Sequence, residues 1–301
     1  MTKRDEIYAQ VTERFVAALE AGVVPWRQTW ALTRDHNPVT GTRYQGINIL
    51  LLALAKMDAA KAGQEFGPLW STFNGWKKLG GSVNRGEHGS LVVFWDVSER
   101  ETGEIGPNGE PVKEPRFLLR TYTVFNLAQT AGVTLPKGYE RREELGEIDG
   151  EAIAADVIAG IVDGPTETSA DAPWYRPGAD LVGMPERAAF DGPAEYWASR
   201  FHEYVHATGH ARRLNRPGIA EAASFGSDRY SREELVAEIG AGFMLARCGL
   251  LEATFENNAG YIGGWLERIK GDASLVVKAA AEAEKAAAWL LGEVNGAARA
   301  A

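Results

Sequence analysis

The most constraining feature of this sequence is only five residues long. Residues 202–206 read His-Glu-Tyr-Val-His, an H-E-x-x-H pattern. Two histidines four positions apart share one face of a helix, so His202 and His206 can both reach a single metal ion. A bound zinc ion lowers the pKa of a water molecule, and Glu203 is close enough to accept its proton. The pattern therefore predicts a helix with two metal ligands and a catalytic carboxylate.

The residues around this pattern favour the same helix. Trp197, Phe201 and Val205 recur at helical spacing, so an apolar face continues through the motif. Gly209 is a suitable stop, which predicts a helix over residues 193–208. The alternative is a chance match on a surface helix, since so short a pattern recurs by accident. The apolar face and an acidic segment downstream favour the metal site.

That downstream segment carries two carboxylates that could complete the site. Glu234 and Glu238 are four positions apart, beside apolar residues, in a helix expected from Ser231 to Cys248. Carboxylates against a core need partners, and a metal ligand plus an acceptor for a ligand histidine accounts for both. We predict Glu234 as the third ligand and Glu238 as the acceptor; exchanged roles are the alternative. A capping box from Ser231 to Glu234 is the purely structural reading of Glu234.

His210 is the rival third ligand, four residues after His206. Gly209 is expected to end the helix first, which leaves His210 as a neighbour of the site or an alternative ligand. The longer pattern H-E-x-x-H-x-x-G-x-x-H is matched through Gly209, but its last position holds Arg212. This departure counts against the metzincin class of peptidases.

Composition limits the other classes of site and partner. The chain has 301 residues, enough for two domains, and its one cysteine, Cys248, excludes a disulfide framework and a multi-cysteine zinc site. The net charge of −9 excludes a uniformly basic nucleic-acid coat. The acidity is uneven, because residues 1–125 carry a net charge of +1 and the remainder −10. A local cationic surface in the first part is compatible with these values.

The chain contains no run of eighteen apolar residues, so we expect no membrane span and no membrane partner. Its first residues continue into an amphipathic pattern without a cleavable apolar region, so no secretory signal is expected. With a single thiol, a cytoplasmic location is the simplest expectation.

Aromatic and cationic residues alternate through the first half of the chain. This mixture suits single-stranded nucleic acid, because bases stack on aromatic rings while phosphates pair with Arg or Lys. The competing interpretation is that the tryptophans are core residues and the arginines are ordinary surface side chains. The candidates for contact with single-stranded DNA are Trp26, Arg27, Trp30, Arg43, Tyr44, Trp76, Lys77 and Arg85.

Hydrophobic periodicity predicts an α+β protein of two domains. The first domain is mixed, and the second is mainly helical with a small sheet. Expected helices cover residues 4–21, 46–62, 72–79, 151–160, 193–208, 231–248, 257–270 and 275–291, and expected strands cover 91–97, 117–125 and 180–184, with an exposed hairpin tip over 99–115.

Two resemblances sharpen these expectations. The acidic helix after the H-E-x-x-H pattern resembles that of the gluzincin metallopeptidases, in which a glutamate completes the metal site. Further motifs, in the same order along nearly the whole chain, resemble the ArdC antirestriction family. They are residues 25–27, 37–41, 44–48, 80–89 and 124–126 in the first half, and 202–209, 233–238 and 256–262 in the second.

The resemblance implies a division into three parts. Residues 1–127 would be a single-stranded-DNA-binding domain, 128–150 a linker and 151–301 a zincin-like metallopeptidase domain. His202, His206 and Glu234 would bind Zn²⁺, with Glu203 as general base; Mn²⁺ or another divalent ion is the alternative, because such a ligand set suits several metals.

The family further implies a cytoplasmic protein from a plasmid or phage. It would protect incoming DNA from restriction during conjugation, with a host protein, unidentified from the sequence, as its substrate. The alternative function is a non-catalytic protein that coats single-stranded DNA and holds a structural metal. Cleavage of a protein substrate is the property that separates the two, because both functions include binding of single-stranded DNA.

Overall fold

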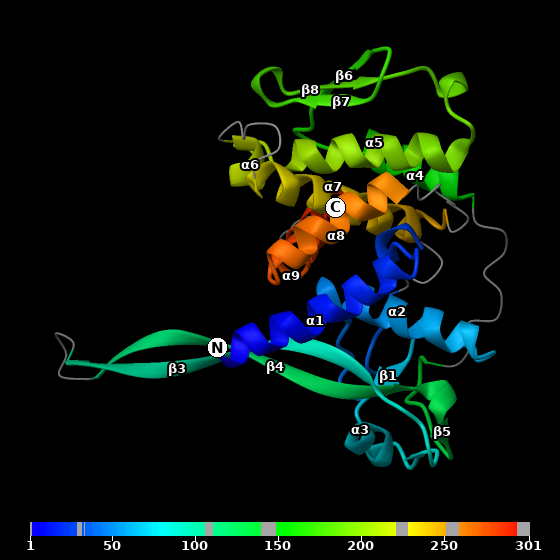
Figure 1. Cartoon of the computed structure of the whole chain (residues 1–301), viewed down its shortest axis with the longest axis vertical. Helices are drawn as coiled ribbons and strands as arrows, with labels where there is room; N and C mark the ends of the chain where they lie inside the picture. The colour runs from blue at the N-terminus through cyan, green and yellow to red at the C-terminus, as the bar shows by residue number, and fades with distance from the viewer. Residues whose placement is uncertain are drawn as a thin grey trace.

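The fold is described from a computed structural model, over residues 2–28, 32, 34–105, 111–139, 149–220, 228–250 and 259–293. It is a mixed α+β arrangement in which a helical half, with a small sheet, lies above a half built on a long β-hairpin (Figure 1). Helices α1 (Lys3–Glu20) and α2 (Ile47–Lys61) lie between these two halves. None of the described helices combines the length and apolar character needed to cross a membrane.

The hairpin of β3 (Ser90–Ile105) and β4 (Pro111–Asn126) dominates the first half. The two strands pair antiparallel, with Ser90 opposite Val124 and Val97 opposite Phe117, and β1 (Trp70–Ser71) adds a third strand beside β4. The strands continue well past the expected runs, through much of the segment predicted as an exposed tip. Shorter elements complete this half: η1 (Pro25–Arg27), α3 (Phe73–Lys78), β2 (Ser82–Val83), η3 (Leu127–Gln129) and β5 (Thr130–Ala131).

Strand β5 pairs with β2, so the start of the segment predicted as a linker packs with the first half of the chain. Asn126 caps η3, its side chain accepting from the backbone N–H of Ala128 while Gln129 reaches back to the N–H of Asn126. The division at residues 127 and 150 stays a prediction.

The second half places a three-stranded sheet over α5 (Pro193–Thr208). The strand order is β6 (Thr166–Ser169), β8 (Leu181–Met184), β7 (Trp174–Arg176); β6 runs parallel to β8 and β7 antiparallel. Helix α5 packs on α7 (Asp228–Cys248), which also packs on α9 (Leu275–Leu290). The other helical elements are α4 (Gly150–Ala159), η4 (Pro177–Ala179), η5 (Arg187–Ala189), α6 (Pro217–Ala220) and α8 (Ala259–Gly271).

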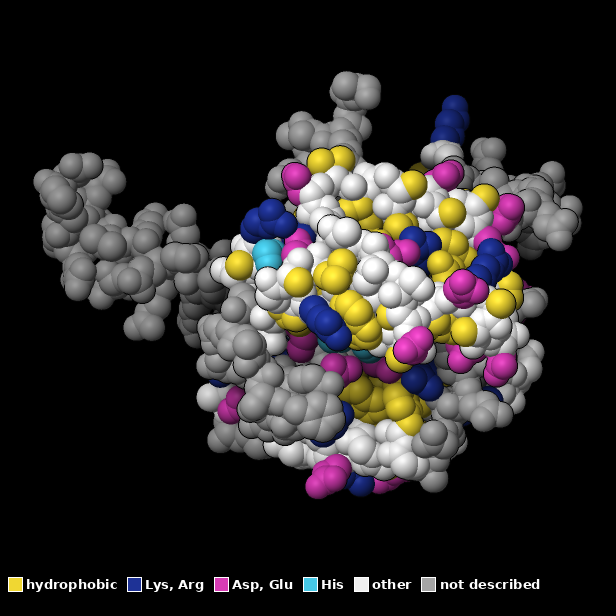
Figure 2. Space-filling view, turned by 90° about the horizontal axis from the view of Figure 1, so that it is seen from above, with side chains coloured by type: hydrophobic (Ala, Val, Ile, Leu, Met, Phe, Trp, Pro, Cys, Tyr) yellow, Lys and Arg dark blue, Asp and Glu magenta, His cyan; other side chains and the backbone are white. Residues whose placement is uncertain are grey.

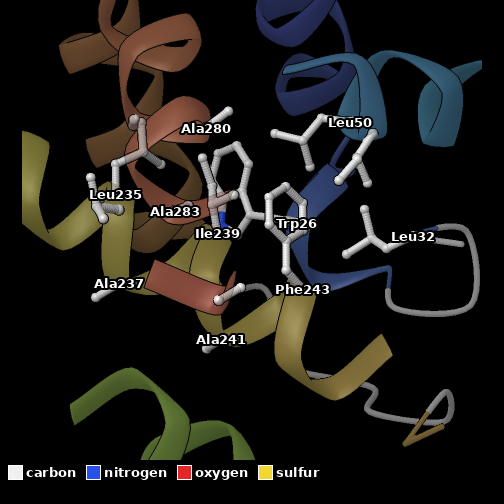
Figure 3. Close-up of a cluster of buried hydrophobic side chains, with 14 of the residues drawn as sticks. Trp26, Leu32, Leu50, Leu235, Ala237, Ile239, Ala241, Phe243, Ala280 and Ala283 are labelled. Carbon is white, nitrogen blue, oxygen red and sulfur yellow. The ribbon is translucent and has the colours of Figure 1, made fainter. Parts of the chain in front are cut away.

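One apolar core joins the two halves. Trp26 of η1 lies among Leu50 of α2 and the α7 residues Ile239 and Phe243 (Figure 3). The tryptophan is only 1% exposed. A Cβ atom built on Gly242 would stand 2.2 Å from the Trp26 carbonyl oxygen, so only glycine lets α7 approach this loop so closely. The first half therefore packs directly against the helix that carries the acidic segment.

The expected helices are present with shifts of a few residues at their ends, and α5 occupies the expected range of 193–208. Residue 209 follows its last turn as the cap, in agreement with the predicted stop. The predicted DNA contact Trp30 lies outside the described residues.

Candidate metal centre

Helix α5 presents one face to the core and turns the H-E-x-x-H pattern toward α7. Proline at its first position suits a helix start, because no N–H is needed there. Trp197, Phe201 and Val205 are buried on the core side. The apolar face thereby fixes the rotation of the helix about its axis and aims His202 and His206 at the acidic segment.

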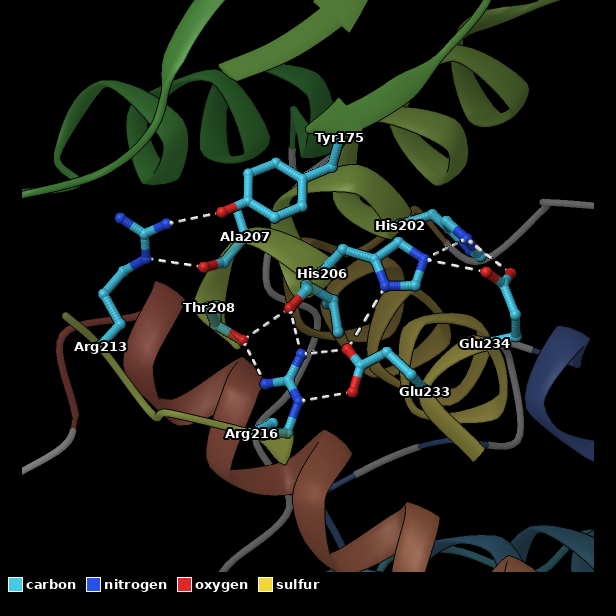
Figure 4. Close-up of polar contacts among 10 residues, drawn as sticks. Tyr175, His202, His206, Ala207, Thr208, Arg213, Arg216, Glu233 and Glu234 are labelled. Atoms are coloured by element: carbon cyan, nitrogen blue, oxygen red, sulfur yellow. Dashed lines mark hydrogen bonds and ion pairs between the residues drawn. The ribbon is translucent and has the colours of Figure 1, made fainter. Parts of the chain in front are cut away.

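The ligand atoms of the two histidines and Glu234 converge on one point (Figure 4). The Nε2 atoms of His202 and His206 are 3.1 Å apart. Glu234 Oε2 lies 3.5 Å from Nε2 of His202, and its Oε1 lies 3.6 Å from Nε2 of His206. Nitrogen and oxygen ligands about 2.1 Å from a tetrahedral ion are about 3.4 Å from one another, so these side chains fit a divalent metal with little movement.

The electrostatics of the group also favour a cation. Burial disfavours the imidazolium form of His202, but a hydrogen bond with Glu234 and the negative charges of Glu238 and Glu203 outweigh it and raise its pKa to about 9. Without a metal, these carboxylates therefore hold a proton on His202. A divalent ion would replace that proton as the positive charge, because an imidazole must be neutral to act as a ligand.

A second carboxylate, Glu233, orients His206. Its Oε1 lies 3.3 Å from Nδ1 of His206 and accepts a hydrogen bond from it, which leaves the lone pair of Nε2 directed at the ligand group. Arg216 donates to both oxygens of Glu233, from Nη2 at 2.6 Å and from Nε at 3.0 Å, and donates from Nη1 to Thr208 at 2.7 Å. Burial opposes ionisation of Glu233, but its bonds with His206 and Arg216 keep its pKa below the ordinary value.

This arrangement corrects the role predicted for Glu238. In the described residues the acceptor for a ligand histidine is Glu233, and Glu238 lies outside the group of converging ligand atoms. Glu238 instead accepts hydrogen bonds from Nε and Nη2 of Arg27 at 3.4 Å each, while that guanidinium lies 3.8 Å over the ring of Tyr261. Adjacent positions on a helix point about 100° apart, so Glu233 and Glu234 serve different sides of the metal group.

His210 is also outside this group among the described residues. It follows the cap of α5, and its Nδ1 accepts a hydrogen bond from the backbone N–H of Arg212 at 3.3 Å. The end of the helix at Gly209 turns the chain away before His210 can continue the series.

We expect replacement of Glu233 by Ala to weaken metal binding by about 10- to 100-fold, because the acceptor that orients His206 is lost. A competition titration of Mn²⁺ or Zn²⁺ against a chromophoric chelator measures this affinity. Glu233→Gln keeps an acceptor oxygen and is the matched control, for which a smaller loss is expected. Unchanged affinity in a folded Glu233→Ala protein would remove this role.

Three of the four aromatic residues predicted to contact DNA are interior residues, and the fourth, Trp30, lies outside the described residues. Trp26, Tyr44 and Trp76 are 1%, 5% and 0% exposed. The hydroxyl of Tyr44 donates to the carbonyl of Trp70, and the indole N–H of Trp76 donates to that of Phe125. In this conformation no base can stack on these rings, which corrects their predicted surface role.

Of the four Arg and Lys residues predicted to contact DNA, one is mostly buried and three are exposed. Arg27 is mostly buried in its contact with Glu238, at the junction of the two halves. Arg43, Lys77 and Arg85 are exposed on the surface of the first half, where their contact with DNA stays a prediction.

The metal group is accessible from solvent. The side chains of His202 and Glu234 are 21% and 25% exposed. In the view from above (Figure 2), imidazole groups are visible in a hollow among acidic side chains, with an apolar patch beside it. Among the described residues, the ligand group is therefore partly open to solvent.

Comparison with known proteins identifies similar families for both halves. Residues 5–125 match the model of the N-terminal domain of the anti-restriction factor ArdC. Residues 151–282 match the model of a zincin-like metallopeptidase. The second match includes α5 and α7, and so contains the ligand group described above.

Individual relatives resemble the chain over most of its length. The uncharacterized protein y4eC of Sinorhizobium fredii is 34% identical, over 95% of this chain and 91% of that protein. The DNA primase TraC of Escherichia coli is 32% identical over 95% of this chain, which spans only 20% of the length of that primase.

Solved structures of the antirestriction protein ArdC from plasmid R388 are similar throughout. The metal-free structure aligns with a TM-score of 0.71 at 37% identity, over 94% of this chain and 96% of that one. The Mn(II)-bound structure aligns with a TM-score of 0.72 at 35% identity, over 97% and 99% of the two chains.

Proposed function

This chain belongs to the ArdC antirestriction family, and on that premise we propose that it binds single-stranded DNA and cleaves peptide bonds with a metal ion. The proposal places both activities in the protection of incoming DNA during conjugation. The alternative is a non-catalytic protein that coats single-stranded DNA and uses the metal for stability alone.

One observation carries the peptidase half of the proposal. The ligand atoms of His202, His206 and Glu234 converge at a place where the side chains of His202 and Glu234 are partly exposed, and Glu203 follows directly after the first ligand on the same helix. An ion held there would polarise the carbonyl of a peptide and lower the pKa of a water molecule. The ligand set accepts zinc, manganese or another divalent ion.

The residues of the chain have separate tasks in this reaction. His202, His206 and Glu234 hold the ion, and Glu233 with Arg216 keeps His206 in the tautomer that binds metal. A carboxylate oxygen of Glu203 accepts the proton of the attacking water and afterwards delivers it to the leaving amine nitrogen. Glu203 therefore gains and loses one proton in the hydrolysis of each peptide bond, and ends in its starting protonation state.

The DNA-binding half is supported by family membership and by charge. The match to the ArdC N-terminal domain covers residues 5–125, and residues 1–125 carry a net charge of +1 in a chain of net charge −9. A positively charged groove that follows a phosphate backbone is the general basis of single-strand binding.

Two assays on the full chain test the two halves separately. Cleavage of an unstructured protein such as casein is expected with Zn²⁺ or Mn²⁺ and is expected to stop when a chelator removes the metal. Binding of a fluorescent oligonucleotide is expected to weaken as salt is added. The logarithm of the binding constant should fall linearly with the logarithm of the salt concentration, with a slope of about −0.7 for each phosphate neutralised. Binding without cleavage in the metal-loaded protein would favour the alternative, and absence of binding would contradict both functions.

A further inference from the structure

A cavity of about 330 Å³ opens on the three-stranded sheet of the first half. Its lining includes Phe94 of β3 and Tyr122 of β4, together with Asn37, Thr40 and Thr72. It lies apart from the metal group, which is built from α5 and α7 of the second half. The metal-dependent reaction therefore leaves this cavity without a role.

The apolar side of the cavity is a row of aromatic rings that leads from the core to the surface. Buried Tyr44 is 6.0 Å from Phe94 between ring centroids, and Phe94 is 5.6 Å from Tyr122 with the rings nearly perpendicular. Tyr122 is 43% exposed, so its ring ends the row in solvent. Edge-to-face pairing of Phe94 with Tyr122 fixes the Tyr122 ring and leaves part of it uncovered.

The residues that line the cavity carry no formal negative charge. They belong to segments 36–44, 72–78, 90–95 and 119–125, none of whose residues is Asp or Glu, and Asp96 follows next on β3. In a chain of net charge −9, these four segments contain only positive formal charges. The exposed cations among them are Arg43, Lys77, Lys78 and Arg120.

Arg120 has a defined place in this surface. It is directly opposite Phe94 in the β3–β4 ladder, and Tyr122 is two residues further along the same strand. Residues opposite each other, or two apart on one strand, share a face of the sheet. The guanidinium is therefore attached on the same face as both rings, within reach of a phosphate joined to whatever stacks there.

The lining of the cavity also includes short polar side chains. The carboxamide oxygen of Asn37 accepts hydrogen bonds from the backbone N–H of Val39 and the hydroxyl of Ser71, which fixes its position. Thr40 and Thr72 each use the hydroxyl oxygen to accept a local backbone N–H and still have a hydroxyl proton to donate. An aromatic floor with a hydroxyl and amide rim suits a flat polar heterocycle.

From these contacts we propose that the cavity holds one unstacked nucleobase of a single strand. The base stacks on Tyr122 beside Phe94, its polar edge faces the threonine and asparagine rim, and Arg120 pairs with an adjoining phosphate. The proposal rests on the single-stranded DNA binding proposed above and names its contact surface. In this proposal Tyr122 takes the stacking role that the sequence predicted for Trp26 and Trp76, whose buried rings cannot stack on a base.

The test uses the full chain and a fluorescent oligothymidylate of about twelve nucleotides. Tyr122→Leu is expected to lower affinity about 5- to 150-fold, because stacking of one base is lost. Tyr122→Phe keeps the ring and is expected to bind within about twofold of the unmodified protein. Arg120→Gln is expected to reduce the slope of log K against log salt by about 0.7, while Tyr122→Leu leaves this slope unchanged.

Controls separate this inference from the proposed function. Ile153→Ala alters an exposed apolar residue of α4 in the second half and is expected to bind like the unmodified protein. Unchanged affinity of Tyr122→Leu, with normal binding by the unmodified chain, would overturn the base pocket alone. Failure of the unmodified chain to bind the oligonucleotide would overturn the DNA-binding function, and the pocket with it.

Discussion

Replacing Glu203 by Gln is expected to abolish cleavage of peptide bonds while the protein remains folded and able to bind metal. Gln has nearly the same shape as Glu but cannot accept a proton from water at neutral pH. Loss of a positioned general base lowers the rate about 10²- to 10⁴-fold. The measurement is the initial rate of hydrolysis of a quenched fluorescent peptide by the metal-loaded variant and by the unmodified chain.

The control for this variant is its metal content. His202, His206 and Glu234 are unchanged in Glu203→Gln, so its affinity for Zn²⁺ or Mn²⁺ and its thermal midpoint are expected to stay close to those of the unmodified chain. Cleavage at the original rate in a metal-loaded Glu203→Gln protein would disprove the assigned role. Protection of incoming DNA in cells that express this variant would show that antirestriction proceeds without proteolysis.

Replacing Glu234 by Ala is expected to lower metal affinity more than 100-fold. Its carboxylate supplies one of three converging ligands, and even the loss of a partner behind a ligand reduces affinity by about 10- to 100-fold. Metal bound after dialysis against a weak chelator, measured by mass spectrometry, gives the comparison with the unmodified chain.

The matched control for Glu234 is one helical turn further along α7. Glu238→Gln retains an oxygen that accepts from Arg27, so the junction of the two halves is preserved while the negative charge is removed. We expect its metal content to remain near that of the unmodified chain. Metal loss in Glu238→Gln together with retention in Glu234→Ala would reverse the assignment of the third ligand.

Much of the local structure follows from sequence periodicity. The apolar spacing of Trp197, Phe201 and Val205 specifies both the helix and the face that it buries. The strands of the β3–β4 hairpin were underestimated, because charged residues over 99–115 resemble a loop in composition but can pair in an extended ladder. In a ladder the backbone supplies the hydrogen bonds, so polar side chains do not end a strand by themselves.

Residue type alone gave the wrong prediction for aromatic side chains whose burial matters. The sequence does not distinguish an exposed tryptophan from a buried one, because the difference depends on what packs against the ring. Trp26 is covered by α2 and by α7, and α7 begins more than two hundred residues later in the chain. Only the packing of these helices together excludes Trp26 from solvent. Tyr122 has the opposite outcome, since no described element covers the outer part of its ring.

The sequence by itself determined the parts of the site that depend on neighbours along the chain. His202 and His206 share a helix face because their spacing matches the helical repeat, and Gly209 ends that helix. The tertiary structure alone decided which carboxylates meet them. The packing of α7 against α5 brings Glu234 to the two Nε2 atoms and Glu233 to Nδ1 of His206, and leaves Glu238 to Arg27. Helical periodicity sets which side chains share a face, but only the contact between two helices sets which of those faces meet.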